Sequence, residues 1–110
     1  MKRLILLLVT LTTLFAGPAY GEEAMKYFEL GVQSSVTRKK IEYFTRALEL
    51  DPSLIEAYEK RGMLYYYQEN YENAIQDYLT YIELAPARGE AHVMAGILYL
   101  KKGLYEPALY

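Results

Sequence analysis

The feature that most constrains the fold of this chain is a pattern that returns at a fixed interval. The segment Leu48–Pro52, LELDP, recurs as Ile82–Pro86, IELAP, so that Pro52 and Pro86 are 34 positions apart. Other positions keep the same interval, namely Gly62 and Gly96, Tyr65 and Tyr99, Tyr71 and Tyr105, and Ala74 and Ala108. Coincident offsets of one length indicate a short structural unit in tandem. The sequence therefore predicts a repeat array instead of one globular fold.

The clearest unit is Tyr58–Pro86, which has the pattern of two amphipathic helices joined by a turn near Glu69 and Asn70. Its second helix carries one apolar stripe at helical spacing, formed by Tyr71, Ala74, Ile75, Tyr78, Leu79 and Ile82. Asn70 is placed to cap the start of this helix, because its side chain can accept from a free backbone N–H of the first turn. Pro86 is expected to close it.

The first helix of this unit is marked by Tyr58, Gly62 and Tyr65, which fall on one face. The glycine leaves room for a second helix to approach closely. Ser53, with Glu56 three residues later, predicts a capping box at the start of this helix.

At these positions the chain resembles the tetratricopeptide repeat family, whose 34-residue helix-turn-helix unit has the pattern W-x2-L-G-x2-Y…A-x3-F…P. The matching residues of the central unit are Tyr58, Gly62, Tyr65, Ala74, Tyr78 and Pro86, with tyrosine in place of the tryptophan and the phenylalanine. Arg61 stands where the family has leucine, and Tyr81 where a small residue is common, which suggests altered local packing. The resemblance implies an all-α, helix-turn-helix solenoid of about two and a half repeats with antiparallel helix pairs.

The predicted organisation is a signal peptide over 1–21, a degenerate first repeat over 22–52, a second repeat over 53–86 and an incomplete third repeat over 87–110. In the first repeat, Gly31 and Phe44 are only 13 positions apart, whereas Gly62 and Tyr78 are 16 apart. About three residues are therefore missing near the turn, and helices are expected at about 23–32 and 38–50. Arg38, Lys39 and Lys40 crowd the first turn of the latter, which predicts a frayed start.

The third unit opens at the family spacing with His92, Ala95, Gly96 and Tyr99, and Gly103 is expected to end its first helix in a left-handed turn. Solenoids need polar caps at both ends and about three repeats for independent stability. The repeat count therefore predicts a fragment, a truncated reading frame or part of a longer array.

Residues 1–21 have the pattern of a signal peptide. Lys2 and Arg3 precede the apolar run Leu4–Phe15, and the small-residue stretch Ala16–Gly21 follows. Ala19 and Gly21 favour cleavage before Glu22, with Gly17 and Ala19 as the second choice. The alternative is an uncleaved anchor, but the run of 12 residues is shorter than the roughly 20 that span a bilayer. The prediction is an exported protein, periplasmic or extracellular, without stable membrane insertion after cleavage.

Composition excludes several classes of function. The chain has no cysteine, which excludes disulfides, thiolate metal sites and a lipid-modified cysteine. Without residues 1–21 it keeps ten basic against fourteen acidic residues, which is no electrostatic footprint for nucleic acid. His92 is the single histidine and occupies an aromatic position of the repeat, so packing is favoured over catalysis. We therefore expect no enzyme, no metal site and no cofactor.

The resemblance implies a concave groove, lined by the first helix of each repeat, that binds an extended or helical segment of a partner protein. The groove residues carried over are Glu56, Glu59, Met63, Tyr66 and Tyr67 in the central unit and Glu90, Val93, Ile97, Leu100 and Lys101 in the third. Such a surface favours an apolar peptide with some basic character and disfavours an acidic tail. For Tyr66 and Tyr67, packing against the neighbouring repeat remains an equal alternative.

Two other functions stay open. The chain is either the N-terminal scaffold of a longer enzyme or assembly factor, or a structural module that self-associates through its open C-terminal end, after Gly103.

Overall fold

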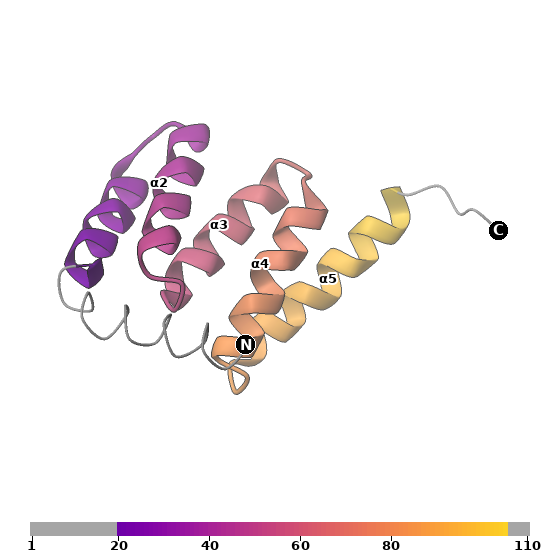
Figure 1. Cartoon of the computed structure of the whole chain (residues 1–110). Coiled ribbons are helices and arrows are strands. Elements are labelled where there is room, and N and C mark those ends of the chain that lie inside the picture. Colours follow the sequence, from indigo (N-terminus) through magenta and orange to yellow (C-terminus); the bar gives the residue numbers. More distant parts are fainter. Residues whose placement is uncertain (1–19, 106–110) are drawn as a thin grey trace, which may run out of the picture.

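The computed structural model describes residues 20–105, and this part of the chain is an array of helices without strands. A first helix covers residues 20–33 of the described part. It is followed by α2 (Thr37–Leu50), α3 (Ile55–Tyr67), α4 (Tyr71–Leu84) and α5 (Gly89–Tyr105). Each helix from α2 onward packs against the next one in the chain, and Figure 1 shows them side by side in sequence order. The predicted all-α solenoid is confirmed.

The turn of the central unit lies where the sequence places it. Glu69 has a positive φ of 60°, and Asn70 caps α4 by accepting from the backbone N–H of Asn73 at 3.4 Å. An Asn in this role satisfies one of the free donors at the helix start. The α4 helix ends at Leu84, two residues before Pro86.

Two predictions at helix ends are wrong. The N-cap of α3 is Leu54, without a side-chain hydrogen bond, while the N–H and hydroxyl of Ser53 donate to Asp51 Oδ1 at 3.0 and 2.6 Å. The predicted capping box of Ser53 and Glu56 is therefore absent, because Ser53 is held in the preceding turn. Gly103 does not end its helix either, since α5 continues through it to Tyr105 and the φ of Gly103 is not positive.

One basic residue in the first turn of α2 makes a contact that the sequence does not predict. The Nζ of Lys40 donates to the carbonyl oxygens of Gly31 at 3.1 Å and Val32 at 3.0 Å, at the end of the first helix. A cation is favourable at the carbonyl end of a helix. One of the three charges that are unfavourable at the start of α2 therefore stabilises the end of its neighbour.

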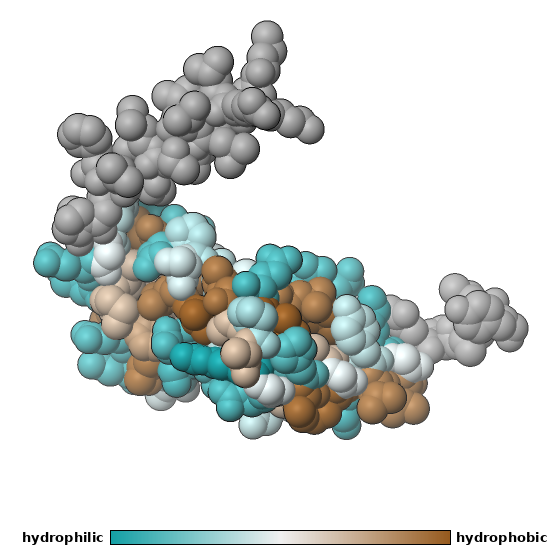
Figure 2. All heavy atoms as spheres, turned by 90° about the horizontal axis from the view of Figure 1, so that it is seen from below, coloured by the Kyte–Doolittle hydropathy of each residue, from teal (hydrophilic) through white to brown (hydrophobic). Residues whose placement is uncertain are grey.

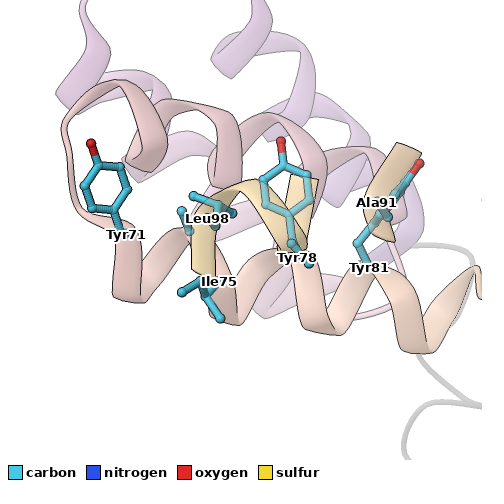
Figure 3. Close-up of a cluster of buried hydrophobic side chains, with 8 residues drawn as sticks. Tyr71, Ile75, Tyr78, Tyr81, Ala91 and Leu98 are labelled. Atoms are coloured by element: carbon cyan, nitrogen blue, oxygen red, sulfur yellow. The ribbon is translucent and has the colours of Figure 1, made fainter. Parts of the chain in front are cut away.

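The core consists of two clusters. The larger lies between α4 and α5, and Figure 3 shows its side chains; the buried members are Tyr71, Ala74, Ile75, Tyr78, Tyr81, Ala91, Ala95 and Leu98. The smaller joins Phe44, Leu48 and Ala57 and is flanked by Phe28, whose ring lies 5.6 Å from that of Phe44. Because the core is divided between successive helix pairs, each helix depends on its neighbours for burial.

Two glycines let an aromatic ring of the next helix lie directly on the backbone. A Cβ built at Gly62 would lie 2.9 Å from the ring of Tyr78, and one at Gly31 would lie 2.7 Å from the ring of Phe44. At the equivalent position of α5, Gly96, nothing described lies within 4 Å. The same contact is thus made twice, and the third glycine has no such contact among residues 20–105.

Arg61, which departs from the family pattern, is part of a largely buried ion pair. Its Nε and Nη2 donate to the two carboxylate oxygens of Asp77 at 2.9 and 2.6 Å, and its Nη1 donates to Thr45 Oγ1 at 3.1 Å. The side chains are 18% and 5% exposed. Burial raises the pKa of the Asp77 carboxyl, and the bonds from Arg61 oppose that rise. The guanidinium therefore joins α2, α3 and α4 at one point.

We expect Gly62→Ala to lower the free energy of unfolding by about 1–2 kcal/mol, because the added methyl group overlaps the buried ring of Tyr78. The matched control is Gly96→Ala, where no atom of residues 20–105 lies within 4 Å of the new methyl group and alanine's helix propensity should add up to about 1 kcal/mol. Urea unfolding followed by circular dichroism measures both. Equal changes in the two variants would contradict the packing role of Gly62.

The hydroxyl of Tyr78 is buried and has no hydrogen-bond partner among residues 20–105. An unpaired buried hydroxyl is costly, so Tyr78→Phe should raise the free energy of unfolding by about 1 kcal/mol. Burial raises the pKa of Tyr78 from 10.0 to about 12. Between these values the unfolded chain loses this proton and the folded chain keeps it, so this contribution to stability falls as the pH rises.

The advantage of Tyr78→Phe over the wild type should therefore widen from pH 10 to pH 12 in urea titrations. The control is Tyr81→Phe, a change in an equally buried tyrosine whose hydroxyl donates to Glu90 Oε1 at 3.3 Å. That variant should lose stability. A loss in Tyr78→Phe as well would mean that the Tyr78 hydroxyl has a partner.

Candidate functional site: the outer surface of α3 and α5

The predicted groove residues of α3 differ in their exposure to solvent. Tyr67 is 72% exposed and Met63 is 39% exposed, so both present apolar surface to solvent. Tyr66 is half-buried and packs against the larger core cluster, with its ring 6.0 Å from that of Tyr71 and 5.6 Å from that of Tyr67. Tyr66 therefore packs against its neighbours, whereas the side chain of Tyr67 remains exposed.

The predicted groove residues of α5 form a more exposed stripe. Val93 is 63%, Ile97 37% and Leu100 71% exposed. They recur at intervals of four and three residues, which places them on one side of a helix. Figure 2 shows apolar surface gathered over the end of the array that carries α5.

The two sets occupy equivalent positions in successive repeats. Met63 corresponds to Ile97, and Tyr66 to Leu100, at the same interval that separates Pro52 from Pro86. Equivalent positions on equivalent helices of a solenoid face the same side of the array. We call the ten predicted residues together the α3/α5 surface.

Charges edge this surface. Glu56 and Glu90 are exposed, and Glu59 and Lys101 are half-buried. Glu90 is held in place, because its carboxylate accepts from the hydroxyl of Tyr81, which in turn accepts from Arg88 Nη1 at 3.3 Å. Tyr81 is fully buried, so this departure from the small residue of the family fixes an acidic group at the edge of the surface.

Sequence reasoning missed one residue of this surface. Leu104 is 81% exposed and lies four residues beyond Leu100, on the same side of α5. The expectation that α5 ends at Gly103 removed Leu104 from consideration. Its spacing alone would have identified it.

His92 has a structural contact that is repeated in the array. Its Nε2 lies 3.0 Å from the carbonyl oxygen of Pro86, so the ring donates from that nitrogen. The corresponding Tyr58 hydroxyl donates to the carbonyl oxygen of Pro52 at 2.9 Å. These side chains anchor a helix to the loop before it, which favours a structural role for His92.

Two kinds of feature are absent from the described part of the chain. Among residues 20–105, no group of three or more His, Cys, Asp or Glu residues could hold a metal ion. Within the same residues, none of the helices combines the length and the apolar character needed to cross a membrane. The signal peptide expected over 1–21 lies almost wholly outside the described residues.

Comparison with protein-family models identifies the repeat. The model of the tetratricopeptide repeat matches residues 55–88, which span α3, α4 and the loop to α5. A comparison with curated proteins finds no match. Repeats of this family generally mediate protein–protein interactions and are generally non-catalytic scaffolds. The matched model, the constant interval between equivalent residues and the all-α array together identify residues 55–88 of this chain as a tetratricopeptide repeat.

Proposed function

We propose that this chain is a non-catalytic scaffold whose α3/α5 surface binds an apolar segment of a partner protein with some basic character. One observation carries the proposal. Five apolar side chains of this surface remain exposed on the first helices of two successive repeats, namely Met63, Tyr67, Val93, Ile97 and Leu100, and Met63 and Ile97 occupy equivalent positions. The same helices bury their other faces in the core, so folding of the described residues does not use this side.

The energy of binding would come mainly from a few of these side chains. Large exposed groups that become buried in a complex are the usual hot spots, and tyrosine is enriched among them. Tyr67 is the best placed, because its exposed ring rests edge-on against Tyr66, which is itself held by Tyr71. A ring that is already positioned loses little conformational entropy on binding. On α5, Leu100 is the most exposed of the predicted apolar groups of the surface.

The charges at the edge of the α3/α5 surface indicate the charge of the partner segment. The ten residues of the surface include three carboxylates, those of Glu56, Glu59 and Glu90, and one amine, that of Lys101. Complementary charges at the rim of an interface raise the association rate and select between partners more than they add affinity. A partner segment with lysine or arginine beside its apolar residues satisfies both features.

The test is binding of two labelled synthetic peptides by fluorescence anisotropy. One alternates leucine and phenylalanine with lysine, and the other has glutamate in place of lysine. We expect the chain to bind the basic peptide in preference, and Tyr67→Ala to weaken that binding about tenfold, as for a hot-spot aromatic.

The matched control is Tyr99→Ala, which removes a 53% exposed tyrosine outside the α3/α5 surface and should leave the affinity unchanged. Circular dichroism checks that both variants keep their helicity. Equal affinities for the two peptides would overturn the predicted charge preference. An equal loss in the two variants would place the binding site elsewhere.

We further propose that the protein works in the periplasm or outside the cell. The basic, apolar and small-residue segments of residues 1–21 support this proposal. Cleavage before Glu22 would leave Ala24, which is fully buried, in the mature chain.

Mass spectrometry of the exported protein should find Glu22 at the N-terminus, or Tyr20 if Gly17 and Ala19 direct cleavage. An intact Met1 in protein recovered from the cytoplasm would contradict the proposal of export.

A further inference from the structure

Arg88 lies in the loop between α4 and α5 and contacts a buried tyrosine of α4. Its Nη1 donates to the hydroxyl of Tyr81 at 3.3 Å, and its Cζ lies 5.9 Å from the centre of the same ring. The Tyr81 hydroxyl donates in turn to Glu90 Oε1 at 3.3 Å. A guanidinium that contacts an aromatic ring and a polar acceptor beside a carboxylate makes the interactions that suit an arginine side chain.

A second carboxylate acts on the same guanidinium. The hydrogen bond to Tyr81 raises the pKa of Arg88, and the charges of Glu56 and Glu90 act in the same direction. Glu56 and Glu90 are 34 positions apart and lie in the first turns of α3 and α5, so they are equivalent residues of successive repeats. Arg88 therefore interacts with two acidic groups at the edge of the α3/α5 surface.

Arg88 is held less firmly than Arg61. The side chain of Arg61 is 18% exposed and makes two bonds to Asp77, at 2.9 and 2.6 Å. Arg88 is exposed, and its bond to Tyr81 is longer, at 3.3 Å. It also directly precedes α5, where the helix dipole disfavours a positive charge. Exposed contacts between charged groups add little to stability, so the side chain of Arg88 can leave this position at little cost in free energy.

The repeat does not need this arrangement in order to fold. The residues 34 positions before Tyr81 and Arg88 are Ala47 and Leu54. Ala47 is fully buried, so the same position of the preceding repeat is filled without a ring or a hydroxyl. Only the acidic residue, Glu56, is common to both places. The tyrosine and the arginine are therefore particular to the junction between α4 and α5.

We infer that Tyr81, Glu90 and Glu56 form a subsite for an arginine side chain of the partner segment, and that Arg88 occupies this subsite in the free chain. The inference rests on the proposed function, because it names the basic residue that the α3/α5 surface selects. A planar guanidinium contacts the ring and bonds to the hydroxyl at the same time, whereas the compact ammonium of lysine is less suited to both.

The contact of Arg88 has a consequence for affinity. A partner arginine that takes its place makes the same hydrogen bond to Tyr81 and meets the same charges of Glu56 and Glu90. Arg88 therefore competes with the partner, and the apparent affinity falls with the fraction of time for which the subsite is occupied. Removal of Arg88 should strengthen the binding of an arginine-containing segment.

The experiment uses the full chain as recovered from cells and two labelled peptides, in which leucine and phenylalanine alternate with arginine or with lysine. Fluorescence anisotropy measures their affinities. We expect Arg88→Ala to bind the arginine peptide about five- to tenfold more tightly than the wild type does, as for a subsite that was free about a tenth to a fifth of the time. The lysine peptide should gain less.

Two variants make the test specific. Arg38→Ala removes the same charge at the start of α2, where Nε of Arg38 lies 3.8 Å from the exposed Glu42, and should leave both affinities unchanged. Glu90→Gln added to Arg88→Ala should abolish the gain for the arginine peptide. The backbone bonds of Arg88 to Ala85 and Ala91 do not use its side chain, so circular dichroism should show the helicity of the wild type.

A second measurement needs no peptide. Methylguanidinium at millimolar concentration should shift the backbone amide NMR signal of Glu90 in Arg88→Ala until the signal reaches a limiting position. The wild type should show no such saturable shift, because Arg88 already fills the subsite. Methylammonium serves as the control ligand and should have a smaller effect in both proteins.

Equal gains in Arg88→Ala and Arg38→Ala would overturn the inference, because the effect would then be one of net charge. Equal gains for the arginine and lysine peptides in Arg88→Ala would overturn it as well. The proposed function fails separately, when the wild type does not distinguish the lysine peptide from the glutamate peptide. Methylguanidinium then decides whether the subsite exists, and the lack of a saturable shift in Arg88→Ala overturns it.

Discussion

The contact on which this array depends is the one between a glycine of one helix and an aromatic ring of the next. A helix in a solenoid cannot bury its apolar face alone, and the neighbours of α3 must come close enough to exclude water. At Gly62 the absence of a side chain lets the ring of Tyr78 rest on the backbone, and at Gly31 the same space holds Phe44. The missing side chains of Gly31 and Gly62 therefore let each of these helices approach the next one closely.

The ion pair of Arg61 and Asp77 adds a fixed point to this packing. Desolvating two charges is expensive, and the cost is offset only when geometry is good and the remaining donors are satisfied. Here two short bonds join the guanidinium to the carboxylate and a third reaches Thr45 on α2. The pair is therefore better understood as a device that fixes the relative positions of three helices than as a source of net stability. In this pair, Arg61 stands at the position where the family has leucine.

Among the described residues, α5 presents two exposed stripes that differ in character. The one with Val93, Ile97 and Leu100 is aliphatic and continues the pattern of Met63 and Tyr67 on α3. The one that holds Gly96 and Tyr99 alternates small and large residues. An aliphatic stripe suits many apolar partners, whereas an alternating one suits a surface of matching shape.

The sequence by itself determined the period, the all-α class, the turn at Glu69 and Asn70 and the equivalence of Gly31, Gly62 and Gly96, because these depend on local propensity and on spacing along the chain. Only the tertiary structure decided which polar groups found partners. Ser53 bonds to Asp51 instead of capping α3, Lys40 closes the first helix, and Arg61 meets a carboxylate 16 positions away along the chain. The exposed α5 residues could be placed from their spacing, but the burial of Tyr66 could not, because it depends on a ring from α4. Contacts between distant residues follow from how helices dock, and docking is a property of the folded array rather than of any one segment.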